Sequence, residues 1–483
     1  MALPQAVLTG IAPDGGLFYP TSIPTVSAAE REQFSRLTYP QLAADILSRF
    51  SPEFAQSDLL ALAQDAYAPE RFTDPNIAPV RALRDDLFLL ELFHGPTGAF
   101  KDFALQLLPR LMRHAARQLD AGDICILVAT SGDTGGAALA GFAGVPGMHL
   151  VTFFPKNGVS PLQQAQMQCA RGKNLAVVEI EGDFDGAQKG VKELFLDTEF
   201  AAELKATRRT RLSSANSINI GRLLPQIVYT FAAHAQLVKH GEIGFDEPLD
   251  LVVPSGNMGD IFAGYLAKRM GLPVGRLLVA NNGNDSAAQF IRSGVFDVRD
   301  RQTARTASPA MDILKASNLE RLLFEASGRD AEKVCAWQQS LAESGTFEVD
   351  AETAARIQAE FCGETVDDAA TAQTIAAMFA ESGYLLDPHT AVGLAALERS
   401  TAMQASPNKK LLFATAHFAK FGQTVFRALF PQASLPPTET EVLQRIAAAA
   451  SMPTIPQHFF DILAAAPCHD RVCAGNTSAM RAT

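Results

Sequence analysis

The sequence of 483 residues has few cysteines and no excess of positive charge. Its six cysteines are scattered, which is typical of free thiols in a reducing compartment and argues against a disulfide framework. The 41 Lys and Arg residues are outnumbered by 52 Asp and Glu residues, so the formal net charge is −11. We therefore expect neither nucleic acid nor an anionic membrane as a partner. A local basic pocket for a small phosphorylated ligand is compatible with this balance.

Long apolar runs are also lacking. No run approaches the roughly 18 residues that a membrane span needs, and the first six residues lack the basic and apolar parts of a secretory signal. Hydrophobic residues make up 47% and charged residues 19%, as in an ordinary folded protein. We predict a cytoplasmic protein with no membrane partner. At about 150 residues per domain, the length allows roughly three domain-sized units.

Several catalytic motifs are absent. The chain contains no G-x-x-x-x-G-K-[ST], H-E-x-x-H, G-x-S-x-G or complete G-x-G-x-x-G pattern. ATPase, zinc protease, hydrolase and dinucleotide-binding functions therefore lack support. Cys468, His469 and Cys473 do not have the spacing of a zinc site, and we expect no metal.

What the sequence does contain is a series of short apolar runs, each followed by small residues and then by a helical pattern. Alternating strands and helices with nearly continuous apolar strands indicate an α/β fold with a parallel sheet. The predicted strands cover residues 124–129, 149–154, 175–180, 249–253, 276–280 and 411–414.

Other stretches lack this alternation, and they suggest where the domains begin and end. We predict a helical N-terminal domain, an α/β core with a smaller lobe, a helical insertion without strands, and a helical C-terminal appendage that ends in a frayed polar tail. The corresponding ranges are 1–80, then 81–300 with 381–430 (smaller lobe about 115–205), then 301–380 and 431–483.

Ligands of open α/β sheets bind beyond the carboxyl ends of the strands, and two of the predicted turns there are unusual. After the run 249–253 comes the turn 254–260, in which Gly256 and Gly259 precede a helical pattern. Free backbone N–H groups and a helix N-terminus would form a phosphate cradle there. The alternative is a tight turn that needs glycine only for its geometry.

The second unusual turn follows the run 124–129 and contains Ser131, Gly132, Asp133 and Thr134 before a helix of small residues. Its hydroxyl and N–H groups could hold a carboxylate or a second phosphate. The alternative is ordinary helix capping, since Ser, Thr and Asp are preferred capping residues.

Lys101 is a third candidate. It lies between Phe100 and Phe103 at the start of a helical pattern. An apolar surrounding disfavours an ammonium ion and lowers the pKa of a lysine, as a lysine that forms Schiff bases requires. The alternative is a lysine whose stem passes the aromatic rings to reach solvent.

Together, these segments resemble the threonine synthases, which belong to the fold type II (tryptophan synthase beta-like) pyridoxal-phosphate enzymes. The resemblance implies an α/β fold with two parallel-sheet lobes, a helical N-terminal domain and a helical insertion. The segments that carry it are 91–103 (ELFHGPTGAFKDF), 129–138 (ATSGDTGGAA), 254–260 (PSGNMGD), 13–20 (PDGGLFYP), 214–226 (SANSINIGRLLPQ), 387–393 (DPHTAVG) and 414–421 (ATAHFAKF).

The resemblance implies pyridoxal 5'-phosphate as the cofactor and assigns residues to it. Lys101 would carry the cofactor covalently, and Thr415 would hydrogen-bond the pyridine nitrogen. A neutral hydroxyl can donate to an unprotonated nitrogen, whereas a carboxylate would hold a pyridinium. Asp133 would face the 3' oxygen of the ring. The cofactor phosphate would be bound by Gly256, Asn257, Met258 and Gly259.

The implied activity is that of a carbon-oxygen lyase. O-phospho-L-homoserine and water would give L-threonine and phosphate by γ-elimination and β-addition of water, with Lys101 as covalent anchor and general base in turn. The alternative for Arg222 is a surface salt bridge. The expected substrate-binding residues are Thr97, Ser131, Gly132 and Thr134, and, for the leaving phosphate, Lys156, Ser160, Asn216, Ser217, Asn219 and Arg222.

Two other functions stay open. A threonine-synthase-like phospholyase would release 2-oxobutyrate in place of threonine, and a catalytically silent relative would have a binding role. The family usually has a Ser-Thr-Arg-Gly segment near its start that this chain lacks, and Phe418 replaces a family proline. For His389, the sequence favours a role in a helix cap with Asp387. We expect a small-molecule substrate and a monomer or homodimer.

Overall fold

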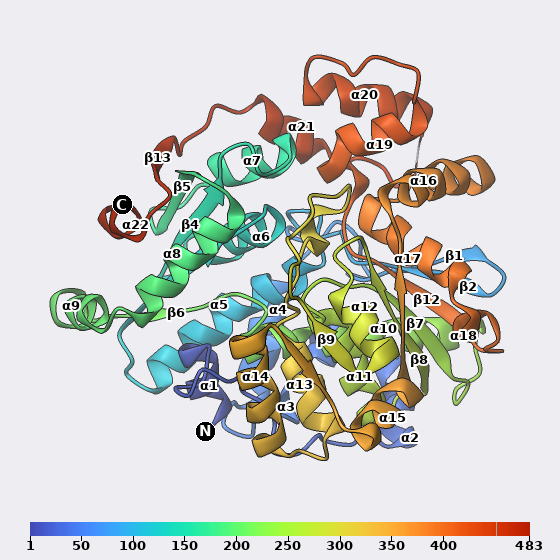
Figure 1. Ribbon diagram of the computed structural model, residues 1–483, viewed down its shortest axis with the longest axis horizontal. Coiled ribbons are helices and arrows are strands. Elements are labelled where there is room, and N and C mark those ends of the chain that lie inside the picture. Colours follow the sequence, from blue (N-terminus) through green and yellow to red (C-terminus); the bar gives the residue numbers. More distant parts are fainter. Residues whose placement is uncertain (451) are drawn as a thin grey trace.

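Two β-sheets organise the computed structural model, which describes residues 1–450 and 452–483 (Figure 1). The larger sheet has the spatial order β1-β2-β12-β7-β8-β11, and all its neighbouring strands are parallel except the antiparallel pair β1 and β2. Its strands are β1 (Val80–Arg84), β2 (Leu87–Glu91), β7 (Leu249–Pro254), β8 (Val274–Asn281), β11 (Phe361–Thr365) and β12 (Lys409–Ala414).

The smaller sheet is parallel throughout, with the order β13-β5-β4-β3-β6. Its strands are β3 (Asp123–Ala129), β4 (Met148–Pro155), β5 (Leu175–Glu181), β6 (Thr210–Ser213) and β13 (Arg471–Ala474). The predicted α/β fold with two parallel-sheet lobes is confirmed. All six predicted strands are present, because each is an apolar run that a sheet covered on both faces can bury.

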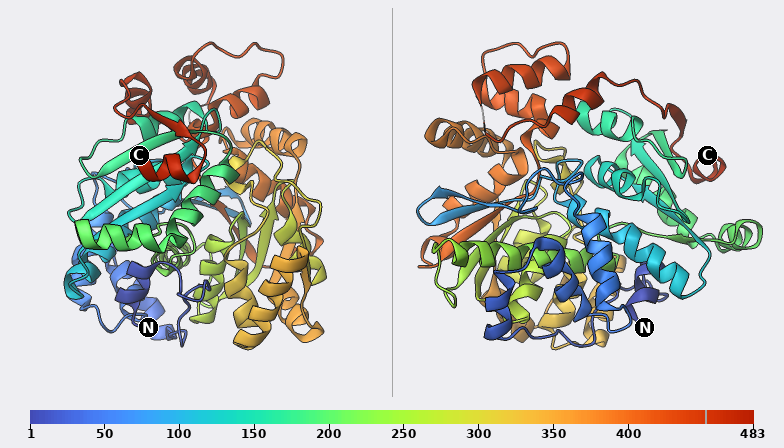
Figure 2. Two further views of the ribbon diagram at one scale, coloured as in Figure 1. Left: turned by 60° about the vertical axis from the view of Figure 1, so that its left-hand side comes forward. Right: turned by 180° about the vertical axis from the view of Figure 1, so that it is seen from behind.

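Helices surround both sheets, as the rotated views show (Figure 2). Those before β3 are α1 (Leu3–Thr9), α2 (Ala28–Phe34), α3 (Tyr39–Ser48), α4 (Gln56–Ala66) and α5 (Lys101–Gln118). The next are α6 (Asp133–Phe142), α7 (Pro161–Gln168), α8 (Phe184–Leu196), α9 (Thr198–Arg208), α10 (Ile220–Lys239) and α11 (Gly259–Arg269). The rest of the chain contains α12 (Ser286–Ser293), η1 (Pro309–Met311), α13 (Leu319–Ala326), α14 (Ala331–Ser344), α15 (Ala351–Glu360), α16 (Asp368–Ser382), α17 (Pro388–Arg399), α18 (Thr401–Gln404), η2 (Phe418–Phe421), α19 (Gly422–Leu429), α20 (Glu439–Ala449), α21 (Gln457–Ala464) and α22 (Thr477–Ala482).

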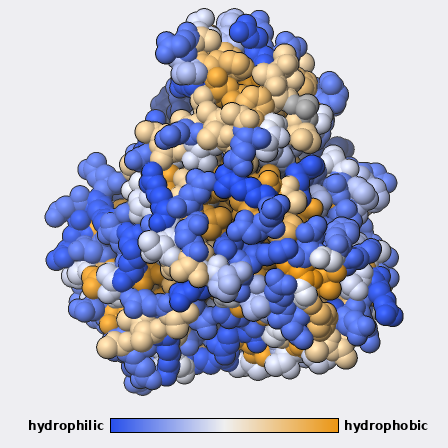
Figure 3. Space-filling model, turned by 90° about the vertical axis from the view of Figure 1, so that its right-hand side faces the viewer, coloured by the Kyte–Doolittle hydropathy of each residue, from blue (hydrophilic) through white to orange (hydrophobic). Residues whose placement is uncertain are grey.

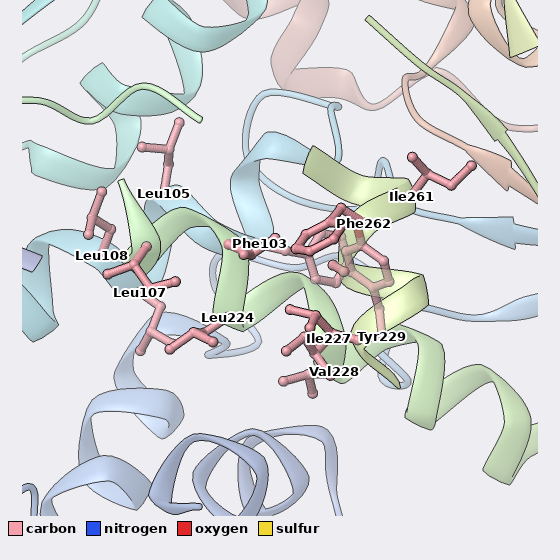
Figure 4. Packing of buried hydrophobic residues seen from close by; sticks show 14 of the residues in the cluster. Phe103, Leu105, Leu107, Leu108, Leu224, Ile227, Val228, Tyr229, Ile261 and Phe262 are labelled. Atoms are coloured by element: carbon pink, nitrogen blue, oxygen red, sulfur yellow. The ribbon is translucent and has the colours of Figure 1, made fainter. Parts of the chain in front are cut away.

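Both faces of the large sheet are buried under apolar side chains. Because side chains alternate along a strand, Leu251 and Val253 of β7 join one apolar core while Val252 joins the other. The first core includes α5, α10 and α11, whose apolar side chains meet in Figure 4. There, Phe103 packs edge-on against Tyr229 with ring centroids 5.7 Å apart. This packing anchors α5, and therefore Lys101 at its first residue.

The predicted helical insertion is wrong in one respect, because it contains strands. β10 (Thr346–Glu348) forms a short antiparallel pair with β9 (Val295–Asp297), which lies just before the predicted insertion, and β11 is an edge strand of the large sheet beside β8. The sequence of β11, FCGET, is short and carries a glycine and a glutamate, so it lacks the apolar run that marks a central strand.

Gly363 of β11 provides a test of this placement. A Cβ atom there would lie 2.7 to 3.1 Å from backbone atoms of Ala288 in α12, and backbone cannot move aside as a flexible side chain can. We expect Gly363→Ala to destabilise the protein by about 1–3 kcal/mol, seen as a lower midpoint of thermal unfolding. Gly283→Ala is the matched control, since nothing lies within 4 Å of its Cβ position. Equal midpoints for the two variants would contradict the packing of β11 against α12.

The expectation of a frayed C-terminal tail is also wrong. Residues 471–474 form β13, which pairs in parallel with β5, and Met480 of α22 is buried. The Met480 sulfur lies against α8 near Gly190. The strand could not be predicted from this polar sequence, because an exposed edge strand is ordered by backbone pairing and needs little apolar surface.

The outer surface is mostly polar. On the face drawn in Figure 3, charged and polar residues predominate, and apolar residues gather mainly near the top, where α19 and α20 lie. Among the described residues, no helix combines the length and hydrophobicity needed to cross a membrane.

Candidate active site

A cavity of about 710 Å³ lies between the two lobes, at the carboxyl ends of β3, β7 and β12. It contains residues from all three candidate segments that the sequence singled out. The predicted residues that line it are Lys101, Ser131, Asp133, Thr134, Asn216, Ser217, Arg222, Gly256, Asn257, Met258, Gly259 and Thr415.

Lys101 is held by the turn that precedes α5. Asp102, which is fully buried, accepts hydrogen bonds from the Thr97 backbone N–H at 2.9 Å and from the Thr97 hydroxyl at 2.8 Å. Burial raises the pKa of Asp102 to about 6, and these hydrogen bonds oppose the shift. The Phe100 N–H donates to the Thr415 carbonyl at 2.8 Å, so the turn is also fixed to the end of β12. The lysine therefore starts its helix from a rigid position.

The Lys101 side chain is not free in solvent, which rules out the alternative of a lysine that reaches past the rings to water. Its Nζ lies 3.3 Å from Asp133 Oδ2 and 4.6 Å from the centre of the Phe100 ring. Burial lowers the pKa of Lys101; Asp133 opposes this shift, while Arg222 and Lys420 add to it. An amine of this kind can lose its proton more readily than a surface lysine.

Asp133 is the first residue of α6, where the helix dipole favours an anion. Its Oδ1 accepts a hydrogen bond from Gln163 Nε2 at 2.8 Å and lies 3.3 Å from Lys420 Nζ. Burial opposes ionisation, but Lys420 and Lys101 together hold the pKa of Asp133 well below its usual range. A buried carboxylate therefore lies between two lysines.

The turn that contains Asp133 also caps α6, in agreement with the helix-capping alternative from the sequence. The Thr130 hydroxyl accepts hydrogen bonds from the N–H groups of Gly132 at 3.0 Å and Gly135 at 2.9 Å. Ser131 and Thr134 nevertheless line the cavity. The segment caps α6 with one residue and presents others to the cavity.

The turn between β7 and α11 has the form of an anion cradle. Met258 has a left-handed backbone (φ 60°) directly before the helix. The backbone N–H groups of Asn257 and Met258 donate to no acceptor in the part of the chain that the structure describes. The Asn257 side chain is fixed, because its Oδ1 accepts a hydrogen bond from the Ser317 hydroxyl at 3.1 Å. These free donors and the N-terminus of α11 would suit a phosphate group.

Arg222 is a buried cation of the cavity that has no anionic partner among the described residues. It is 2% exposed, and its Nη1 donates to the Ala215 carbonyl at 2.8 Å. Its Nε has no hydrogen-bond partner, and no carboxylate among the described residues forms an ion pair with it. Burial lowers its pKa to about 10. The alternative of a surface salt bridge is therefore wrong, and the site leaves room for an anionic ligand.

Five predicted substrate-binding residues do not line this cavity. The Thr97 side chain is bonded to Asp102, and Gly132 lies beneath the Gln163 side chain. Lys156 is exposed, and Ser160 caps α7 beside a neighbouring cleft of about 450 Å³. Asn219 donates to the Val7 and Ser214 carbonyls at 2.9 and 2.8 Å. These five are not among the residues that line the cavity, and their roles stay predictions.

Some cavity residues were not expected from the sequence. His389 lines the cavity as well as belonging to a cap: its Nδ1 lies 2.8 Å from Asp387 Oδ1, and its Nε2 accepts a hydrogen bond from the Ala310 N–H at 3.1 Å. Asp260 lines it next to the anion cradle, and burial raises the pKa of its carboxyl to about 6. Lys420 does not line the cavity but contacts Asp133. His389 and Lys420 belong to the quoted motifs, but the sequence did not predict that His389 lines the cavity or that Lys420 contacts Asp133.

The chemistry of the donor set fits pyridoxal phosphate. A buried lysine of lowered pKa, an N–H cradle at a helix start, and the hydroxyl-bearing Thr415 lie in one cavity. These groups match the aldehyde, the phosphate and the ring nitrogen of that cofactor. In the described residues, no group of three or more His, Cys, Asp or Glu is arranged to hold a metal ion.

Comparison with known proteins shows the family to which the chain is related. Residues 1–67, 75–362 and 390–461 match the families described as threonine synthase N terminus, pyridoxal-phosphate dependent enzyme, and threonine synthase, C-terminal. Human threonine synthase-like 1 is 39% identical over 433 residues, which are 88% of this chain and 58% of that protein. The chain thus spans little more than half the length of that relative.

Two further relatives match over more than nine-tenths of both chains. Threonine synthase of Pseudomonas aeruginosa is 38% identical over 445 residues, 91% of both chains. The crystal structure of pyridoxal-phosphate-bound threonine synthase from Brucella melitensis superposes with a TM-score of 0.87 at 36% identity, covering 100% of this chain and 96% of that one. With the lysine, the cradle and the two lobes in place, the chain belongs to the threonine synthase family of pyridoxal-phosphate-dependent enzymes.

Proposed function

We propose that the protein is a threonine synthase, which converts O-phospho-L-homoserine and water to L-threonine and phosphate, the last step of threonine biosynthesis. The observation that carries this proposal is Arg222, a buried cation without a counterion in the same cavity as Lys101. A phosphorylated substrate would supply the missing negative charge. The match to threonine synthases over most of the chain supports the same reaction.

The cofactor would be held by the chain's own groups at three points. Lys101 Nζ would bind its aldehyde carbon, the N–H groups of residues 256–259 its phosphate, and the Thr415 hydroxyl its ring nitrogen. Asp133 would face the 3' oxygen. When bound, pyridoxal phosphate would supply an electron sink for negative charge at the substrate α and β carbons.

The protein's groups would then handle the substrate and its protons. Ser131 and Thr134 line the cavity beside Lys101 and would bind the substrate carboxylate. Arg222, Asn216 and Ser217 also line the cavity and would bind the substrate phosphate. Lys101 Nζ, once displaced by the substrate amine, would remove the Cα proton, because burial favours its neutral form. Loss of a Cβ proton would let phosphate leave from Cγ. Water would then add at Cβ, and protons would return to Cγ and Cα.

A threonine-synthase-like phospholyase is the second candidate, and its specific support is the 39% identity to human threonine synthase-like 1. The two candidates share the elimination of phosphate and differ in whether water adds at Cβ before release. Release without that addition would give 2-oxobutyrate.

Phosphate release tests the shared part of both candidates. Purified protein loaded with pyridoxal phosphate should release phosphate from O-phospho-L-homoserine and show an absorbance band of lysine-bound cofactor. O-phospho-L-serine serves as a control, because it has the same charge and a side chain that is one methylene shorter. We expect much slower phosphate release from it. A protein that binds the cofactor but releases no phosphate from either compound would refute the proposed activity. The cytoplasmic location and the monomeric or dimeric state stay predictions.

Thr415 offers a separate test of the cofactor position. Thr415→Val keeps the shape of the side chain and removes the hydroxyl, so we expect kcat to fall by up to about tenfold, since one net hydrogen bond contributes roughly 0.5–1.5 kcal/mol. The absorbance maximum of the bound cofactor should also move. Thr415→Ser retains the hydroxyl and should keep both properties close to the original. Identical spectra and rates for all three proteins would place the ring nitrogen elsewhere.

A further inference from the structure

Lys420 lies in η2, five residues after Thr415, and its side chain is fully buried. Its Nζ donates to the Thr97 carbonyl at 2.7 Å and to Gln166 Oε1 at 2.8 Å, and it lies 3.3 Å from Asp133 Oδ1. These partners belong to the turn before Lys101, to α7 and to α6. One ammonium group therefore connects the lysine-bearing turn to two helices of the small lobe.

Asp133 is shared between two lysines through its two oxygens. Oδ1 faces Lys420 and Gln163, while Oδ2 lies 3.3 Å from Lys101 Nζ. A buried carboxylate is stabilised only when it is paired, and here one negative charge serves two ammonium groups. Lys420 also has two neutral acceptors within 2.8 Å, whereas the hydrogen bond to Asp133 is the one that Lys101 Nζ makes with a described residue. The arrangement therefore favours the charge on Lys420 over the charge on Lys101.

Other titratable groups surround these residues. Five groups each interact electrostatically with Lys420, Asp133 or Lys101: Asp102 of α5, Arg222 of α10, Asp260 of α11, His389 of α17 and His458 of α21. Lys420 lowers the pKa of both Asp133 and Lys101. Without Lys420, Lys101 would be the one lysine among the described residues that forms an ion pair with Asp133.

We propose that Lys420 is a positioning residue: it holds Asp133 in place and offsets its charge, so that Lys101 can be neutral when it binds the cofactor and takes up protons. The inference rests on the proposed function only in taking Lys101 as the cofactor-binding lysine. It does not depend on which phosphorylated amino acid is the substrate.

The test uses the full-length apoprotein and pyridoxal phosphate without substrate. The neutral Lys101 amine condenses with the aldehyde and releases one water, so the rate at which the absorbance band of lysine-bound cofactor grows reports the neutral fraction. We expect the pH midpoint of this rate to rise by about one unit or more in Lys420→Met, because Asp133 then holds the proton on Lys101. Lys268→Met is the matched control: this partly buried lysine pairs with Glu360, and its loss should leave the midpoint unchanged.

Two further variants separate charge from structure. Asp133→Asn alone should lower the midpoint below that of the original protein, and this holds even where Lys420→Met fails to fold. The double variant Lys420→Met with Asp133→Asn should have a lower midpoint than Lys420→Met. Slower band growth with unchanged midpoints in every variant would mean that Lys420 is only structural and would overturn the proposal. Because no phosphohomoserine is used, a failure here differs from a failure of the proposed reaction.

Discussion

Lys101→Ala is expected to remove the absorbance band of lysine-bound cofactor and to lower phosphate release by roughly 10³-fold or more. Lys101 is the cavity lysine whose Nζ is buried against Asp133 and whose pKa is lowered. Its loss removes the covalent anchor and the proposed base together. Absorbance spectroscopy and a phosphate assay on the same preparation would measure both effects.

The control for this variant is Lys173→Ala, since Lys173 is exposed on the small lobe and lines none of the cavity. We expect it to keep the band and the rate. Should Lys101→Ala retain the band, another lysine would carry the cofactor. Should it lose the band but keep the rate, the proposed role as base would be wrong.

Arg222→Met should produce the second large effect, a loss of about 10²-fold or more in kcat/KM for O-phospho-L-homoserine. The reason is that a buried ligand phosphate would lose its charged partner, and truncating one member of a buried charge pair costs about 2–5 kcal/mol. Most of the loss should appear in KM, because the phosphate is bound before it leaves. Steady-state kinetics over a range of substrate concentrations would separate KM from kcat.

Arg222→Lys provides the comparison, because it retains the positive charge and loses the planar fork. We expect it to lie between the original protein and Arg222→Met. Both variants should bind pyridoxal phosphate normally, since the cofactor cradle is the turn between β7 and α11. An unchanged KM in Arg222→Met would contradict the placement of the substrate phosphate at Arg222.

How much of this site could be predicted depends on where each signal lies in the sequence. The turns after β3 and β7 were found because parallel strands bring their carboxyl ends to one edge, so a glycine-rich turn after an apolar run has a predictable location. Lys101 is a candidate because of its apolar neighbours, and the resemblance assigns it to the cofactor; Thr415 comes from the resemblance alone. The apolar surroundings of Lys101 hinted at its chemistry, but a lysine between two phenylalanines has a harmless alternative, and only the distance to Asp133 decides between them.

The failures concern side-chain direction, edge strands and β2, a buried inner strand of the large sheet that is missing from the predicted strands. Asn219 and Arg222 lie three residues apart in one motif, yet Asn219 fixes the chain to Val7 and Arg222 enters the cavity. The directions of these two side chains depend on how α10 packs against α5, and no local sequence pattern predicts that packing. β11 and β13 were missed because edge strands are ordered by backbone pairing. Lys420 was quoted in a motif, but its role follows from the approach of α6, α7 and the lysine turn.

The fate of the carbon skeleton is the property that most directly distinguishes a threonine synthase from its relatives. The decisive measurement is the product balance after complete turnover of a known amount of O-phospho-L-homoserine, with phosphate, threonine and 2-oxobutyrate quantified in the same sample. The account predicts one threonine for each phosphate and little 2-oxobutyrate. Phosphate matched by 2-oxobutyrate in place of threonine would contradict it and assign the protein to the phospholyases.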